Sequence, residues 1–264
     1  MTYKDILVHI GSIDHCGGVL DLAIKLAMKH KGRLTGLHVI THCHYSSQLE
    51  STHARAKEFQ AVFMEKTGGA GIPAEWLCVD WPVVGERAFK VVNLHAFCKD
   101  IVVVGQTESS SRKGLVEPDL PERVILGSGR PVLIVPYVGT FLTVGERVMI
   151  AWKNGRESTR AVNDAMPFLL NASEVNVLAL GSAEAGESAD KIIAHLSLHG
   201  IRVGRQYFSL EDISVGDVLL NQAWEERCDL LVMGGVTRSS GGVVLGPIAR
   251  HILKHMTSPV LMSH

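Results

Sequence analysis

The segments CKDIVVVG, at residues 98–105, and RCDLLVMG, at residues 227–234, decide the fold because they are two versions of one pattern. Each is a short apolar run that ends in glycine. A second matched pair follows at a similar distance, SGRPVLIV at 128–135 and MTSPVLMS at 256–263. Landmarks that recur at a nearly constant offset indicate an internal repeat, so the sequence predicts two copies of one domain.

Both copies alternate apolar runs with helical patterns. Before residue 137 the runs are ILVHI (6–10), GLHVI (36–40), AEWLCV (74–79), IVVVG (101–105) and PVLIVP (131–136). After it they are RVMIAW (147–152), EVNVLAL (174–180), RVGRQYF (202–208), DLLVMGG (229–235) and PVLMS (259–263). Continuously apolar strands are typical of a parallel sheet that helices cover on both faces.

The fold class predicted is therefore α/β, with two tandem doubly wound domains. Each domain has a five-stranded, largely parallel sheet flanked by helices. Residues 137–145 form a short connecting stretch with two glycines, which places the domains at 1–143 and 144–264.

The composition excludes several classes of protein. Of the 264 residues, 46% are hydrophobic and 20% charged, as in a packed globular protein, and the formal net charge of -1 provides no basic field for nucleic acid. No apolar run approaches the roughly 18 residues of a membrane span, and MTYKDILVHIG at the start leads into a strand and lacks signal-peptide features. We expect a cytoplasmic protein without membrane or nucleic-acid partners.

The cysteines and histidines favour structural roles. The five cysteines are odd in number and include no C-x-x-C pair, which argues against a disulfide framework and a zinc ribbon. His42, Cys43 and His44 are adjacent, but alternate residues of an extended segment point to opposite sides and cannot alone form a tetrahedral ligand set. We predict no metal site.

The position of a ligand follows from the fold class. In a doubly wound sheet, ligands bind beyond the carboxyl ends of the strands where the strand order reverses, here after the first and fourth strands. In the second copy these segments are 153–156 and 234–247. The latter is rich in glycine, serine and threonine and leads into a helix, so its N–H groups could face a phosphate.

No motif of an enzyme accompanies these loops. The sequence contains no G-x-S-x-G elbow, no Walker A loop and no G-x-G-x-x-G after the first strand, so we predict no catalytic residues. A small-molecule hydrolase and a purely structural scaffold that dimerises through its sheet edge are the alternatives.

Four segments resemble the universal stress protein family in its tandem two-domain form: YKDILVHI (3–10), LLVMGG (230–235), LG-x-x-x-RHILKH (245–255) and SPVLMSH (258–264). The resemblance covers essentially the whole chain. It implies the strand order 3-2-1-4-5 and association through the last strands, either as a pseudo-dimer within the chain or as a homodimer. It also implies a regulatory or protective role and, in some members, ATP binding.

The ATP-binding pattern of that family is altered in both copies. The family has an aspartate after the first strand, where this chain has Gly11 and Lys153. Its G-x-x-G-x(9)-G-[ST] pattern after the fourth strand becomes Gly234, then Thr237, then Gly246 one residue early. Pro247 follows in place of serine or threonine, and proline provides neither a hydroxyl nor an N–H.

These departures give an asymmetric prediction. Acidic residues such as Glu108 and Glu117 oppose a phosphate in the first crevice, so a nucleotide or other small molecule should bind the second copy, with ATP at most weakly held. Trp152 ends a strand beside this crevice and could stack on a flat ligand. The predicted ligand-binding residues are Gly234, Gly235, Thr237, Ser239, Ser240, Gly241, Gly246 and Trp152.

Overall fold

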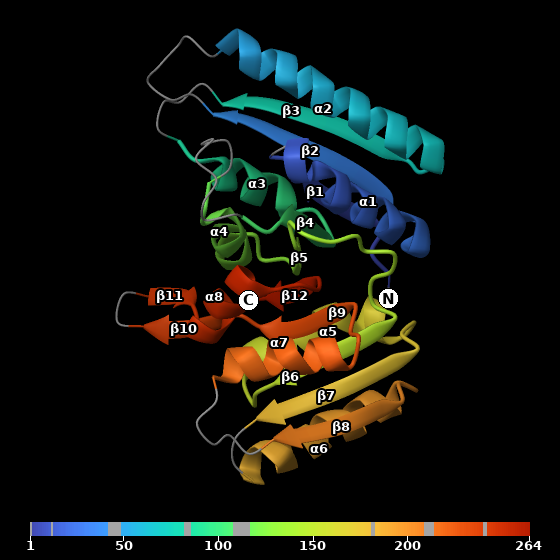
Figure 1. Ribbon diagram of the computed structural model, residues 1–264, viewed down its shortest axis with the longest axis vertical. Helices are drawn as coiled ribbons and strands as arrows, with labels where there is room; N and C mark the ends of the chain where they lie inside the picture. Colours follow the sequence, from blue (N-terminus) through green and yellow to red (C-terminus); the bar gives the residue numbers. More distant parts are fainter. Residues whose placement is uncertain are drawn as a thin grey trace. The chain divides into compact units, whose positions relative to one another are not determined.

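The computed structural model describes residues 2–11, 13–41, 49–81, 86–107, 117–180, 183–208, 214–239 and 242–264. The chain divides into two compact units, Thr2–Tyr137 and Val138–His264. The sequence placed the division six residues later, at the far end of the same connecting stretch. In Figure 1 the first unit runs from blue to green and the second from yellow to red.

The first unit alternates strands and helices in the predicted order. Its elements are β1 (Asp5–His9), α1 (Ile13–His30), β2 (Arg33–Thr41), α2 (Leu49–Ala70), β3 (Ala74–Trp81), α3 (Ala88–Ala96), β4 (Ile101–Gly105), α4 (Leu120–Gly127) and β5 (Val132–Val135). The apolar runs that predicted β1, β4 and β5 are buried almost throughout.

The second unit repeats this order and adds two strands. Its elements are β6 (Arg147–Trp152), α5 (Arg156–Leu169), β7 (Glu174–Leu180), α6 (Ala183–Leu198), β8 (Val203–Phe208), α7 (Val215–Glu225), β9 (Leu230–Gly234), β10 (Val236–Ser239), β11 (Gly242–Leu245), α8 (Pro247–His255) and β12 (Val260–Ser263). The additional strands β10 and β11 pair with each other in an antiparallel hairpin. Both lie in the stretch that the sequence predicted to be a loop.

The strand order confirms the predicted fold class. In the first unit it is β3-β2-β1-β4-β5, and in the second β8-β7-β6-β9-β12, which is the order 3-2-1-4-5 in each case. All pairs in both sheets are parallel. The registers also correspond, since Ile6 pairs with Ile101 and Val148 pairs with Leu230.

The repeated segments contain an aspartate with the same role in both units. The Asp100 carboxylate accepts hydrogen bonds from the backbone N–H groups of Lys4 and Asp5, at 2.6 and 2.9 Å. The Asp229 carboxylate accepts them from Glu146 and Arg147, at 3.0 and 2.9 Å. Each aspartate therefore ties the start of the fourth strand to the start of the first, at the amino ends of the strands.

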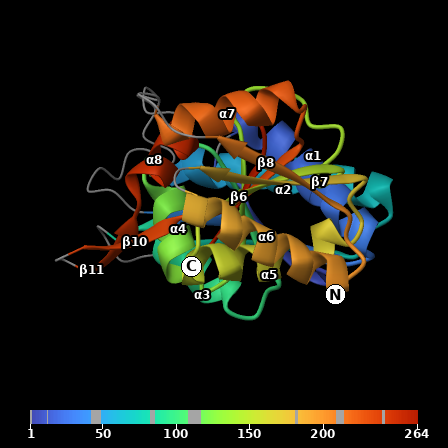
Figure 2. The same cartoon turned by 90° about the horizontal axis from the view of Figure 1, so that it is seen from below.

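The helices of the second unit lie on both faces of its sheet. Figure 2 shows α5 and α6 below β6, β7 and β8, with α7 above them. Helix α5 packs on β6, β9 and β12, whereas α6 packs on β7 and β8, and α7 packs on α8. None of the described helices is long and apolar enough to cross a membrane.

Candidate ligand-binding site

A cavity of about 910 Å³ lies within the second unit at the carboxyl ends of β6 and β9. These two strands are neighbours, and the chain continues from them in opposite directions, so the cavity occupies the point where the strand order reverses. Its volume falls within the roughly 300 to 1,000 Å³ of small-molecule sites. It lies where the sequence predicted a ligand.

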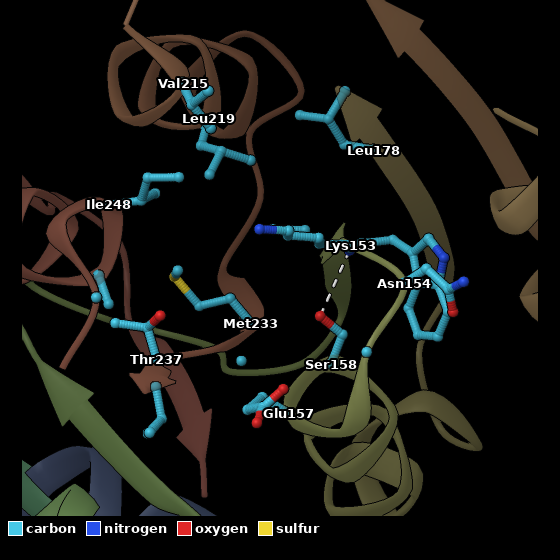
Figure 3. A pocket seen from close by; sticks show the side chains of 18 of the residues that line it. Lys153, Asn154, Glu157, Ser158, Leu178, Val215, Leu219, Met233, Thr237 and Ile248 are labelled. Atoms are coloured by element: carbon cyan, nitrogen blue, oxygen red, sulfur yellow. Dashed lines mark hydrogen bonds between the residues drawn. The ribbon is translucent and has the colours of Figure 1, made fainter. Parts of the chain in front are cut away.

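One side of the cavity is apolar. Figure 3 shows Val215 and Leu219 projecting from α7, Ile248 from α8 and Leu178 from β7, with Met233 beside them at the end of β9. Leu219 and Met233 are buried. These side chains could contact the flat or apolar part of a ligand.

The other side is polar and contains the loop after β6. The exposed Lys153 sends its side chain across the cavity, and Asn154, Glu157 and Ser158 lie at the first turn of α5 (Figure 3). The Lys153 backbone N–H donates to the Ser158 hydroxyl at 3.4 Å. Within the described chain, the Lys153 ammonium group has no hydrogen bond or ion pair. It is available to a ligand.

Several helices begin at this cavity. The N-cap residues of α5, α7 and α8 are Gly155, Ser214 and Gly246, and none of them makes a side-chain capping hydrogen bond. The first N–H groups of a helix favour anions through their partial positive charge. Glu157 and Glu184 also line the cavity, and their carboxylates disfavour an anion. The site therefore combines an unpaired cation and helix N-termini with two acceptors at its rim.

Five of the predicted residues line the cavity, and the structure gives some of them roles in packing. They are Trp152, Gly234, Gly235, Thr237 and Gly246. Trp152 is 8% exposed, and its indole N–H donates to the Ser188 hydroxyl at 2.9 Å. Its ring is thus fixed against α6, a contact that the sequence did not predict.

Gly234 allows a strand and a helix to approach closely. A Cβ atom there would lie 2.7 Å from the backbone carbon of Glu157 and 2.8 Å from the Ser158 nitrogen. Any larger residue would displace the first turn of α5. The packing of β9 on α5 explains this glycine without any contact to a phosphate.

The hairpin corrects the prediction for the glycine-rich loop. Ser239 pairs with Gly242 at the far end of the hairpin, so it lies in a strand and not in a loop. Ser240 and Gly241 lie outside the described residues. The sequence signal for the hairpin is the pair of β-branched runs, Val236–Thr237 and Val243–Val244, on either side of a Ser-Gly dipeptide.

The sequence allows only some of the other lining residues to be predicted. Lys153 directly follows β6, the first strand of the second unit, so the sequence indicates its place beside the crevice. The sequence does not indicate that its side chain extends across the cavity. Glu157, Ser158 and Leu219 carry no local motif. Their positions depend on where α5 and α7 pack.

The corresponding helix start in the first unit is already occupied. The Glu117 carboxylate accepts the N–H of Ala88, the first residue of α3, at 2.5 Å, and lies 3.4 Å from the Arg87 guanidinium. Asp119 pairs with Arg87 and Arg123. Burial by itself raises the pKa of the Asp119 carboxyl. Hydrogen bonds from the two arginines outweigh this effect and hold that pKa below its ordinary value. A side chain of the protein thus caps α3, whereas α7 has no such cap.

Two further predictions fall on undescribed segments. The cluster of His42, Cys43 and His44 and the acidic residue Glu108 lie outside the described residues. Among the described residues, no group of three or more histidines, cysteines, aspartates or glutamates could hold a metal ion.

Comparisons with known proteins agree with this fold. Residues 167–264 match the model of the universal stress protein family. A universal stress protein from Archaeoglobus fulgidus DSM 4304 superposes with a TM-score of 0.77 over 98% of this chain and 97% of its own, at 17% identity. A functionally unknown protein from Pseudomonas aeruginosa PAO1 superposes with a TM-score of 0.66 at 14% identity. The superposition covers 99% of this chain and 92% of that protein. None of the curated proteins matches the sequence.

The family match lies entirely within the second unit, which contains the cavity, and the likeness to solved structures extends over both units. The resemblance predicted from YKDILVHI, LLVMGG and SPVLMSH is therefore confirmed. The second unit matches the universal stress protein family over residues 167–264, and the two units together have the fold of solved tandem two-domain relatives such as the Archaeoglobus fulgidus protein.

Proposed function

We propose that this protein is a cytosolic, non-enzymatic ligand-binding protein of the stress response. In this proposal the second unit holds one small anionic molecule, such as an adenine nucleotide, in the cavity beyond β6 and β9. The observation that supports it best is the unpaired Lys153 ammonium group in a cavity of about 910 Å³. The apolar wall of Val215, Leu219 and Ile248 would hold the uncharged part of the ligand.

Binding without chemistry suits the residues present. The described residues that line the cavity include no histidine or cysteine, and its carboxylates, Glu157 and Glu184, have no paired nucleophile among them. Ser158 lines it, but its hydroxyl accepts a backbone N–H. Prolonged incubation with Mg-ATP should therefore yield no ADP or AMP above the rate without protein, and enzymatic turnover would contradict this part of the proposal.

ATP should be bound weakly. The site has Lys153 in place of a carboxylate that would accept a ligand hydroxyl, and Pro247 in place of a hydroxyl donor. Each missing hydrogen bond costs on the order of 1 to 3 kcal/mol, so two losses weaken binding by roughly tenfold to several thousandfold. We expect a dissociation constant above the micromolar range, and ATP that is lost during purification.

Calorimetric titration with Mg-ATP tests the role of the cavity. Lys153→Glu should weaken binding by at least about tenfold, because it replaces an attractive charge with a repulsive one beside the ligand. Lys191→Glu changes an exposed lysine on α6 that does not line the cavity, and it should leave binding unchanged. A sub-micromolar dissociation constant, or equal binding by native protein and Lys153→Glu, would count against the proposal.

A further inference from the structure

A second cavity of about 700 Å³ lies beside the first, also within the second unit. One wall consists of the first two turns of α5, where Arg156, Thr159, Arg160 and Asn163 line it. Residues three, four and seven apart lie on one face of a helix, so these four form a continuous polar strip. Val243 of the hairpin also lines this cavity.

The two cavities meet at the start of α5. Asn154, Gly155, Glu157 and Val236 line both of them. Gly155 is the N-cap of α5 and has no side chain to separate the two spaces. A ligand in the first cavity could therefore extend past the N-terminus of α5 into the second.

The second cavity differs from the first in charge. Its ionisable lining residues are Arg156, Arg160, Glu157 and His264, whereas those of the first cavity are Lys153, Glu157 and Glu184. Arg160 donates from Nε to Asp164 at 2.8 Å, which fixes its position and compensates its charge. Arg156 makes no hydrogen bond or ion pair through its side chain within the described chain. It is therefore the lining cation best placed to receive an anionic group.

We propose that the ligand is elongated, with a flat or apolar head group in the first cavity and an anionic tail that passes Lys153 and ends at Arg156. This inference rests on the proposed function and specifies the class of ligand. The apolar wall lies on α7, β7 and α8, whereas Lys153 lies in the loop before α5 and Arg156 is the first residue of that helix. A molecule with one anionic group would fill only the first cavity, whereas one with several in a row would reach the second.

AMP is the probe for a short ligand with one anionic group, and Mg-ATP is the probe for a long ligand with several. The native protein should bind Mg-ATP at least about tenfold more tightly than AMP, measured by calorimetry. Arg156→Glu should weaken Mg-ATP binding by about tenfold or more and leave AMP binding within about twofold. Arg202→Glu is the matched control, because Arg202 is an exposed arginine that precedes β8, at the opposite end of the sheet. It should leave both affinities unchanged.

The outcomes separate the two proposals. If Arg156→Glu binds Mg-ATP as the native protein does, the inference is wrong and the proposed function stands. If Arg156→Glu weakens both probes equally, Arg156 serves the whole site and the inference is also wrong. If the native protein binds neither probe, both proposals fail.

Amide resonances of the full-length protein give an independent readout. Those of Thr159 and Asn163 should shift on addition of Mg-ATP and remain in place with AMP, because only the longer ligand reaches the second cavity. Equal shifts with both probes, or none with Mg-ATP, would contradict the inference even if Arg156→Glu were poorly folded.

Discussion

Asp100 and Asp229 hold equivalent positions in the two units, each directly before the fourth strand. The carboxylate of each satisfies two backbone N–H groups before or at the start of the first strand. This contact explains why both copies have an aspartate directly before the fourth strand. The aspartate is part of the repeated pattern in the sequence, but only the structure shows that its carboxylate binds the backbone of the first strand.

Asp229→Ala should therefore destabilise the second unit. Removal of the carboxylate leaves the N–H groups of Glu146 and Arg147 without their acceptor, at a cost of about 1.5 to 3 kcal/mol. Denaturant unfolding measures this loss. Asp190→Ala removes an exposed ion pair with Arg205 and should cost less than about 1 kcal/mol. Equal losses in the two variants would contradict the assigned role.

His9 makes the first unit sensitive to acid. It is 6% exposed in β1, and burial, assisted by the nearby His38, lowers its pKa to about 3. Because the unfolded histidine has a pKa near 6.5, the unfolded chain binds a proton between pH 6.5 and 3 that the folded chain excludes. The stability that His9 contributes is complete above pH 6.5 and declines as the pH falls toward 3.

Unfolding of the first unit at pH 7 and pH 5 tests this linkage. The neutral variant His9→Gln should lose about 2 kcal/mol less stability between these pH values than the native protein, since one proton no longer binds on unfolding. His38 retains part of the dependence, because burial also lowers its pKa. Identical pH profiles for the two proteins would contradict the burial of a neutral His9.

At the scale of elements, the contact of β9 with α5 shapes the cavity. Gly234→Ala should cost about 1 to 3 kcal/mol, because its new Cβ would meet the backbone of Glu157 and Ser158 at 2.7 and 2.8 Å. Gly68→Ala provides the comparison, since a Cβ there meets nothing within 4 Å and lies in α2. It should raise stability by up to about 1 kcal/mol. Thermal unfolding of both variants measures the contrast, and a neutral Gly234→Ala would refute the close approach.

Elements with a strong local pattern were predictable, and tertiary details were not. The apolar runs predicted the parallel strands, and the order of strands and helices predicted both sheets. Glycine, serine and threonine after β9 predicted a loop, but Val236 pairs with Leu245 and Thr237 with Val244 across a hairpin instead. Contact of Gly234 with a ligand stays a prediction, and the close packing of β9 on α5 at this glycine was not evident from the sequence.

At the scale of the whole molecule, the two units differ in what occupies their crevices. Glu117 of the first unit caps α3 and lies beside Arg87. In the second unit α5, α7 and α8 have no side-chain cap, and Lys153 has no partner for its ammonium group among the described residues. The sequence predicted this asymmetry from the acidic residues after β4. Its other prediction at this scale, that PVLIV and PVLMS pair within the chain or with a second chain, stays a prediction.

In the proposed function, the second copy binds a ligand and the first does not. Equilibrium dialysis of the full-length protein against labelled Mg-ATP, carried to saturation, counts the sites directly. The account predicts one ATP per chain in the native protein and a loss of that site in Lys153→Glu. Two sites per chain, or one site that is retained with full affinity in Lys153→Glu, would contradict it.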